Sequence, residues 1–65
     1  MASSREILKV LQAAGWRIHR QSGSHVQLKH LERSGTVTVP HPRRDMPIGT
    51  LKSIETQSGL TFGRK

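Results

Sequence analysis

The absence of cysteine from a chain of only 65 residues is the feature that most limits its fold. A domain of this size buries about 60% of the surface that its unfolded chain exposes, so it contains one modest hydrophobic core. Without cysteine, neither disulfide bridges nor thiolate zinc sites can reinforce that core. We therefore expect residues 1–65 to form a single domain that is stabilised by apolar packing.

The strongly positive charge of the chain points to polyanionic partners. Eleven Lys and Arg residues against four Asp and Glu residues give a formal net charge of +7. Such a charge favours nucleic acid, because phosphate contacts release condensed counterions. A solvated surface, or a basic surface matched to an acidic protein, would have the same composition. The basic residues form no stripe along one helix, so a helix lying on a membrane is not expected.

Membrane and export signals are not apparent in the sequence. No apolar run approaches the roughly 18 residues that are needed to cross a bilayer. The N-terminal residues also lack the apolar stretch of a secretory signal. These features predict a cytoplasmic protein with no membrane partner.

The first predicted element is an amphipathic helix over about residues 4–14. Ser3 and Glu6 have the spacing of a capping box, in which each side chain satisfies a free backbone N–H at the helix start. Gly15 suits a left-handed cap at the other end. The apolar stripe of this helix consists of Ile7, Leu8, Leu11 and Ala14.

Three β-strands are expected after this helix, because the period of the apolar residues changes to two. Turn-like residues at 21–24 and 31–35 separate the strands. In the first strand, which begins at Trp16, Arg17 and His19 lie on the face opposite the apolar residues. The inward face of the sheet is formed by Ile18, Val26, Leu28, Val37 and Val39.

A second helix is expected from Pro47, which suits a first helical turn because it has no N–H group. A proline-bounded basic loop at residues 40–45 precedes it. Gly59 followed by Leu60 fits a glycine cap with an apolar residue closing over the last turn. The apolar stripe of this helix consists of Ile48, Leu51 and Ile54. We expect residues 61–65 to form a frayed tail.

The predicted fold is therefore α+β with the element order α-β-β-β-α. Two helices can cover one face of a three-stranded antiparallel sheet and leave the other face in contact with water. The double-stranded-RNA-binding domain has the same order of elements. Fold alone, however, establishes no activity.

Five short segments then occur in a recognisable order: Gly15-Trp16, Gly23-Ser24-His25, Val37-Thr38-Val39-Pro40-His41-Pro42, Pro47-Ile48-Gly49-Thr50-Leu51 and Ser58-Gly59-Leu60. Together they resemble the HicA toxins, mRNA interferases of HicA/HicB toxin–antitoxin systems, over about residues 4–60. Their order and spacing make chance a poor explanation. The resemblance implies a double-stranded-RNA-binding-like fold, an endoribonuclease that cleaves mRNA, and a HicB-like antitoxin as partner.

The resemblance also implies that His25 is the catalytic residue. RNA cleavage without a metal uses the 2′-hydroxyl as nucleophile, and it needs a base, charge stabilisation on the phosphate and a proton for the leaving oxygen. Histidine suits proton transfer near neutral pH. Strand alternation places His25 opposite Val26, on the solvent side. Gly23 permits close approach of the backbone to a phosphate, and Ser24 offers a hydroxyl.

Basic side chains near His25 are candidates for phosphate contacts. The predicted RNA-binding residues are Gly23, Ser24, Arg20, Lys29, Arg43 and Arg44. For Arg20 and Lys29, a solvated charge is an equally good interpretation. For His41, which lies between two prolines, we favour a structural role in its loop. The alternative is that it is a second proton-transfer residue. His19 and His30 are expected at the surface, and Trp16 in the core.

No metal or cofactor is expected. The four histidines and four acidic residues include no H-x-x-x-H or H-E-x-x-H motif and no carboxylate cluster.

Two other functions fit the residues: a non-catalytic RNA-binding module of the same fold, and a domain whose basic surface meets an acidic protein. If the protein is a toxin, a role in a stress response and a role in phage defence fit the sequence equally well.

Overall fold

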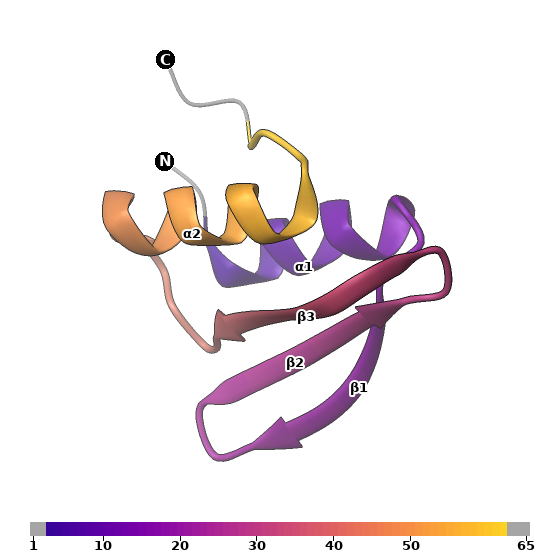
Figure 1. Cartoon of the computed structure of the whole chain (residues 1–65). Coiled ribbons are helices and arrows are strands. Elements are labelled where there is room, and N and C mark those ends of the chain that lie inside the picture. Colours follow the sequence, from indigo (N-terminus) through magenta and orange to yellow (C-terminus); the bar gives the residue numbers. More distant parts are fainter. Residues whose placement is uncertain (1–2, 63–65) are drawn as a thin grey trace.

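The computed structural model describes residues 3–62 and has the predicted order of elements (Figure 1). The elements are helix α1 (Ser4–Ala13), strands β1 (Arg17–Ser22), β2 (His25–His30) and β3 (Arg33–Pro40), and helix α2 (Ile48–Ser58). The strands form one antiparallel sheet in the order β1-β2-β3. Figure 1 shows both helices on the same side of this sheet. The predicted α-β-β-β-α architecture is confirmed.

Helix α1 begins with the predicted capping box. The backbone N–H of Glu6 donates to the Ser3 hydroxyl at 3.2 Å, and the backbone N–H of Ser3 donates to the Glu6 carboxylate at 3.0 Å. The hydrogen bond from the Ser3 backbone is the main reason that the pKa of Glu6 lies below its ordinary value. At the other end, Gly15 has φ of 100°, so the chain leaves the helix through the left-handed region.

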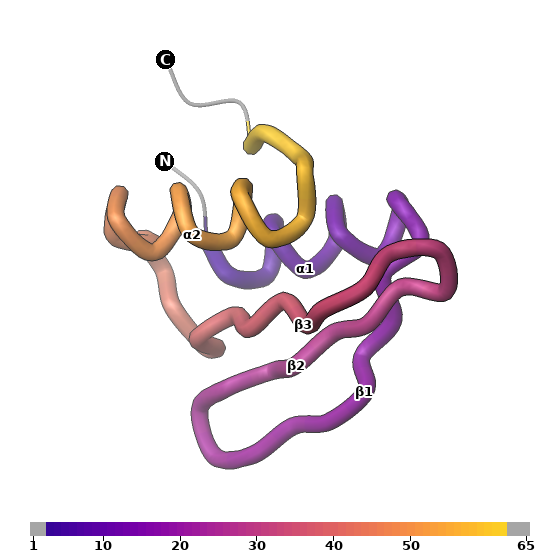
Figure 2. Tube along the Cα trace, viewed as in Figure 1, coloured from indigo at the N-terminus to yellow at the C-terminus, as the bar shows by residue number. Residues whose placement is uncertain are grey.

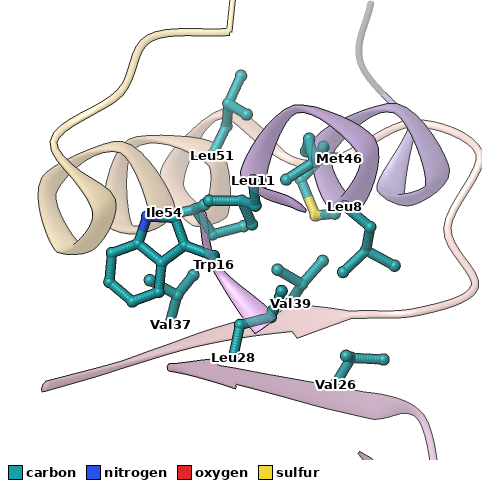
Figure 3. Close-up of a cluster of buried hydrophobic side chains, with 11 residues drawn as sticks. Leu8, Leu11, Trp16, Val26, Leu28, Val37, Val39, Met46, Leu51 and Ile54 are labelled. Atoms are coloured by element: carbon teal, nitrogen blue, oxygen red, sulfur yellow. The ribbon is translucent and has the colours of Figure 1, made fainter. Parts of the chain in front are cut away.

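One hydrophobic core lies between the sheet and the two helices (Figure 3). Its members come from every element except β1: Ile7, Leu8, Leu11, Trp16, Val26, Leu28, Val37, Val39, Met46, Leu51 and Ile54. Four of the five predicted sheet residues are therefore buried. The prediction for Ile18 was wrong, since its side chain is 47% exposed. Strand β1 is one of the two edge strands, and Figure 1 shows it farthest from the helices.

The predicted helical stripes also needed correction at their ends. Ala14 is exposed, and Ile48 is 58% exposed at the first residue of α2. Met46, which precedes α2, is buried instead. Both errors fall at helix ends, because Ala14 is the C-cap residue of α1 and Ile48 is the first residue of α2.

A β-bulge changes the alternation in β1. Ile18 pairs with Leu28, whereas the next paired residue of β1 is Arg20, opposite Gln27. The extra residue is His19, and it shifts the side chains that follow to the other face. The simple alternation predicted for this strand therefore fails beyond Ile18. The turn between β2 and β3 is also shorter than predicted, because β3 already begins at Arg33.

The C-terminal cap of α2 agrees with the prediction. Gly59 has φ of 76°, and its backbone N–H donates to the carbonyl of Glu55. Leu60 and Phe62 are half-buried against the core, and the Phe62 N–H donates to the Glu55 carboxylate at 3.0 Å. The tail predicted at residues 61–65 is thus held at Phe62, and residues 63–65 lie outside the described part of the chain.

Candidate functional site

Three segments that are distant in sequence meet at one end of the sheet. The turn before β2, the end of β3 and the start of α1 lie at the same end of the trace (Figure 2). The His41 N–H donates to the Ser24 carbonyl at 2.7 Å, and the Ser4 N–H donates to the Arg43 carbonyl at 2.9 Å. His25 pairs with Pro40 of β3. The fold therefore brings the Gly23-Ser24-His25 segment beside the basic loop.

His25 is an accessible imidazole at this end of the sheet. It is the first residue of β2 and is exposed, whereas the next residue, Val26, is 1% exposed on the core side. Within residues 3–62, no hydrogen bond occupies its ring. Gly23 has φ of 56°, so the turn before His25 uses the left-handed region. A Cβ added at Gly23 would meet no atom within 4 Å, so open space surrounds this turn.

The basic loop is fixed to α1 through a buried hydroxyl. Ser4 is 1% exposed, and its Oγ lies 2.7 Å from Nδ1 of His41. The same oxygen accepts the Arg43 N–H at 2.8 Å and lies 3.2 Å from the Arg43 carbonyl. These contacts hold the backbone of Arg43 in place. The side chains of Arg43 and the next residue, Arg44, are exposed beside the His25 end of the sheet.

The open face of the sheet carries three basic side chains. Residues directly opposite each other in an antiparallel pair point to the same face. Arg17 is opposite Lys29, and Arg20 is opposite Gln27, on the face that also carries His25. We call Arg17, Arg20, Gln27 and Lys29 the basic sheet face. None of its members, and no residue paired with them in the sheet, is acidic.

The pairing of Arg17 with Lys29 is unfavourable for the isolated protein. Like charges directly opposite each other in a sheet destabilise it. No carboxylate within the paired residues of this face offsets the repulsion. A phosphate backbone would neutralise both charges, so the arrangement suits a polyanionic ligand better than water.

The basic sheet face extends well beyond His25. Lys29 is four residues further along β2, which corresponds to about 13 Å at the rise of a β-strand. The open face thus has the imidazole of His25 at one end and the pair formed by Arg17 and Lys29 at the other. The exposed Arg43 and Arg44 lie in the neighbouring loop, which is hydrogen-bonded to α1 through Ser4. Such a surface can contact several phosphates of one strand.

Two of the predicted phosphate contacts, Arg20 and Lys29, lie on this common face. Sequence reasoning missed Arg17, which completes it. Strand alternation already placed Arg17 on the solvent side, but only the register with β2 reveals that it opposes Lys29. The length of the turn does not give this register, because pairing that continues from Ser22 and His25 without a bulge would place His30, and not Lys29, opposite Arg17.

His30 is a structural residue and not the simple surface histidine that was predicted. Its Nε2 lies 3.1 Å from the Ala14 carbonyl, and its Nδ1 accepts the Glu32 N–H at 3.0 Å. The ring also packs edge-on against Trp16, with centroids 5.3 Å apart. Because both nitrogens have partners in the fold, His30 has no nitrogen left for a substrate. Trp16 is 2% exposed and belongs to the core, as predicted.

Residues 3–62 contain no group of three or more His, Cys, Asp or Glu side chains that could hold a metal ion. Neither α1 nor α2 is long and apolar enough to cross a membrane, a finding that covers residues 3–62.

Comparisons with known proteins identify the family. The profile of the HicA toxin of bacterial toxin–antitoxin systems matches residues 4–60. A solved structure titled "HicA3 and HicB3 toxin-antitoxin complex" contains a chain that is 32% identical, with a TM-score of 0.82, and the match covers 95% of this chain and 100% of that one. A search of curated protein sequences gave no match. The chain belongs to the HicA toxin family of bacterial toxin–antitoxin systems.

Proposed function

We propose that this toxin is an endoribonuclease that blocks translation by cleaving mRNA in the cytoplasm, with His25 as a general acid or base. The observation that carries the proposal is the exposed imidazole of His25, which has no hydrogen-bond partner among residues 3–62. It lies at the end of a sheet face that carries basic and no acidic side chains. An imidazole can accept or donate a proton near neutral pH. Membership of the HicA family supports the same activity.

Each part of the site has a role in this reaction. His25 takes the proton of the 2′-hydroxyl, whose oxygen attacks the adjacent phosphorus. The turn at Gly23 and Ser24 gives the phosphate room to approach the backbone. The basic sheet face, together with Arg43 and Arg44, binds the flanking phosphates and stabilises the charge that develops on the reacting one. This chemistry requires no metal ion.

A HicB-like antitoxin is the proposed protein partner. The related toxin chain occurs in a complex titled with HicA3 and HicB3. An inhibitor with acidic side chains would match the basic sheet face, where Arg17 opposes Lys29. Covering that face would also hide His25 from RNA.

Cleavage of labelled mRNA in the presence of EDTA tests the proposed activity. Wild-type protein is expected to cleave, and His25→Ala to lose about 10²-fold or more of the rate, the usual loss on removing a general acid or base. His19→Ala is the matched control, because His19 is also exposed but lies on β1 at the bulge. It should cleave like the wild type. Equal rates for His25→Ala and wild type would refute the role of His25.

The main competing function is a non-catalytic RNA-binding module of the same fold. The opposed Arg17 and Lys29 favour phosphate binding whether or not cleavage follows. Retention of RNA by the wild type, without any cleavage product under the same conditions, would establish the binding module in place of the enzyme. Absence of both binding and cleavage would leave a protein-interaction domain.

A further inference from the structure

We propose that Gln27 recognises the base next to the cleaved bond and that it favours adenine. The inference deepens the proposed RNA cleavage and rests on it. Contacts with the phosphate backbone are the same at every nucleotide, so the basic side chains of the site give affinity without a sequence preference. A preference requires a side chain that reaches a base, and Gln27 is placed to do so beside His25.

Gln27 lies on the same face of the sheet as His25. Val26 and Leu28, its neighbours in β2, are 1% and 0% exposed and belong to the core. Because successive side chains of a strand point to opposite faces, His25 and Gln27 both point to the open face. Two residues of a β-strand span about 7 Å. A phosphate held at His25 would therefore bring an adjoining nucleotide within reach of Gln27.

A row of three polar side chains crosses the open face at Gln27. Its direct partners are Arg20 in β1 and Thr38 in β3. Between this row and His25 the pairing of all three strands is regular, without a bulge. Thr38 shares the open face because both of its neighbours in β3 are buried. The polar row and the imidazole of His25 thus belong to one continuous surface.

The amide of Gln27 has a hydrogen-bonding capacity that the fold does not use. The side chain is half-buried, and it has no hydrogen-bond partner among residues 3–62. A carboxamide contains both a donor and an acceptor. A phosphate has acceptors only, so it would leave the amide oxygen unpaired, whereas a base edge offers donors and acceptors side by side. Gln27 therefore suits a base better than the phosphate backbone.

Hydrogen bonds, and not stacking on aromatic rings, carry this recognition. The chain contains one Trp, one Phe and no Tyr, and Trp16 and Phe62 both pack in or against the core. The amide of a Gln forms two hydrogen bonds with adenine, in which its NH₂ group donates to N7 and its oxygen accepts from the 6-amino group. In a base-paired RNA helix these groups lie in a deep, narrow groove that side chains cannot read. The expected substrate is therefore RNA with an unpaired adenine beside the cleaved bond.

Cleavage of short, unstructured RNAs that differ in one base tests the assignment. Each RNA is labelled at one end, so that cleavage on either side of the altered base can be followed. The informative pair is adenine and 7-deazaadenine, which lacks N7 and can form only one of the two hydrogen bonds. We expect the wild type to cleave beside adenine about 5-fold faster in kcat/KM, the usual effect of one hydrogen bond. Equal wild-type rates beside the two bases, on both of their sides, would overturn the proposal.

Two variants of Gln27 and a matched control complete this experiment. Gln27→Ala and Gln27→Glu both lack the donor to N7, so each should cleave beside adenine and beside 7-deazaadenine at equal rates. Gln21→Ala removes an exposed glutamine opposite Val26, on the helix side of the sheet, and should keep the wild-type preference. Thermal unfolding of all three variants is the control for folding. A preference that survives in either Gln27 variant, or that is lost in Gln21→Ala, would overturn the role of Gln27.

Binding measurements separate the role of Gln27 from the proposed cleavage. RNA with a 2′-O-methyl group on every ribose has no free 2′-hydroxyl to act as nucleophile and stays intact. Wild-type protein should bind the adenine strand about 5-fold more tightly than the 7-deazaadenine strand, and Gln27→Ala should bind both equally. If the wild type shows this preference but cleaves no RNA, the nuclease function fails and base recognition stands. If it cleaves RNA without any preference, only the role of Gln27 fails.

Discussion

Gly15 has a backbone conformation and close surroundings that a residue with a side chain would not tolerate. It has φ of 100°, and a Cβ at this position would lie 2.7 Å from Nε2 of His30. That nitrogen also contacts the Ala14 carbonyl, so the ring cannot move away without losing a hydrogen bond. The connection from α1 to β1 and the end of β2 therefore depend on each other at a single glycine.

Gly15→Ala should consequently destabilise the protein. We expect a loss of about 1–3 kcal/mol in the free energy of unfolding, the range for a residue held in an unfavourable backbone region. Gly49→Ala is the matched control, because Gly49 is in α2 with ordinary φ and nothing within 4 Å of an added Cβ. It should gain up to about 1 kcal/mol. Denaturant unfolding of both variants measures the difference, and an unaffected Gly15→Ala would contradict it.

The roles of single residues could be predicted from the sequence where a residue contacts its neighbours along the chain. The capping pair Ser3 and Glu6, the left-handed Gly15 and Gly59, and the buried Trp16 were all predicted from the sequence and are found in the structure. The role of His30 was not predictable, because its partners at residue 14 and in the Trp16 ring come from elements that meet only after folding.

Among the elements, α1 depends on its first turn for part of its stability. The capping box satisfies two backbone donors that would otherwise have no partner. Ser4, the next residue, carries the buried contacts to His41 and Arg43. Fraying at this end would therefore loosen the loop beside His25. The helix cap and the site are parts of one structural unit.

This arrangement predicts a loss of stability in acid that depends on Glu6. Its pKa is lower in the folded protein than in the unfolded chain, so ionised Glu6 stabilises the fold above its ordinary pKa. The contribution disappears as the pH falls through the lowered pKa, from about pH 5 downward. Glu6→Gln keeps a hydrogen-bond acceptor without the charge, and its stability should change less over that range. The measurement is the free energy of unfolding of both proteins at several pH values. If it changes with pH to the same extent in the wild type and in Glu6→Gln, the idea is wrong.

The sheet contains a different compromise, because Arg17 and Lys29 oppose each other across β1 and β2. Replacing Arg17 by Thr should raise the free energy of unfolding by about 0.2–1 kcal/mol, since a like-charge pair is removed and a β-branched residue suits a strand. The same change should weaken RNA binding. A double-mutant cycle with Lys29→Thr measures the coupling. A variant that loses stability, or that loses none of its RNA affinity, would contradict this interpretation.

Because of the bulge in β1, the sequence alone did not predict that Arg17 opposes Lys29. Alternation predicts faces correctly only while each residue of a strand has one partner, and the extra residue His19 breaks that rule in β1. Ile18 precedes the bulge and faces the same side as Leu28, and it remains 47% exposed because β1 is the strand farthest from the helices. The strands themselves were predictable, but their register depends on turns and bulges that have no unique sequence signature.

For the whole molecule, the assembly of the candidate site is a long-range property. The segments around Ser4, Ser24 and His41 were each visible in the sequence, yet nothing local indicated that they would meet. Their contacts span up to 39 residues of chain. Packing of two helices on one face of the sheet is what brings the start of α1 to the end of β3, and it leaves the opposite face open for a ligand.

The net charge of +7 is therefore less informative than its distribution. Lys29 is on the open face, whereas Lys52 is an exposed residue of α2, on the side of the sheet that the helices cover. If RNA follows the basic sheet face, Lys29→Ala should weaken binding and reduce the slope of log K against log salt by about one. Lys52→Ala has the same change of net charge and should leave both quantities nearly unchanged.

Measuring RNA affinity at several salt concentrations for the two variants thus separates a defined binding face from general attraction. General attraction would depend on net charge alone, and both substitutions would then lower the affinity to a similar extent with similar slopes. A defined face predicts a clear difference between them, although each variant has a charge of one unit less. Because Lys29 is about 13 Å from His25 along β2, its contribution would also show that the bound RNA extends well past the reacting phosphate.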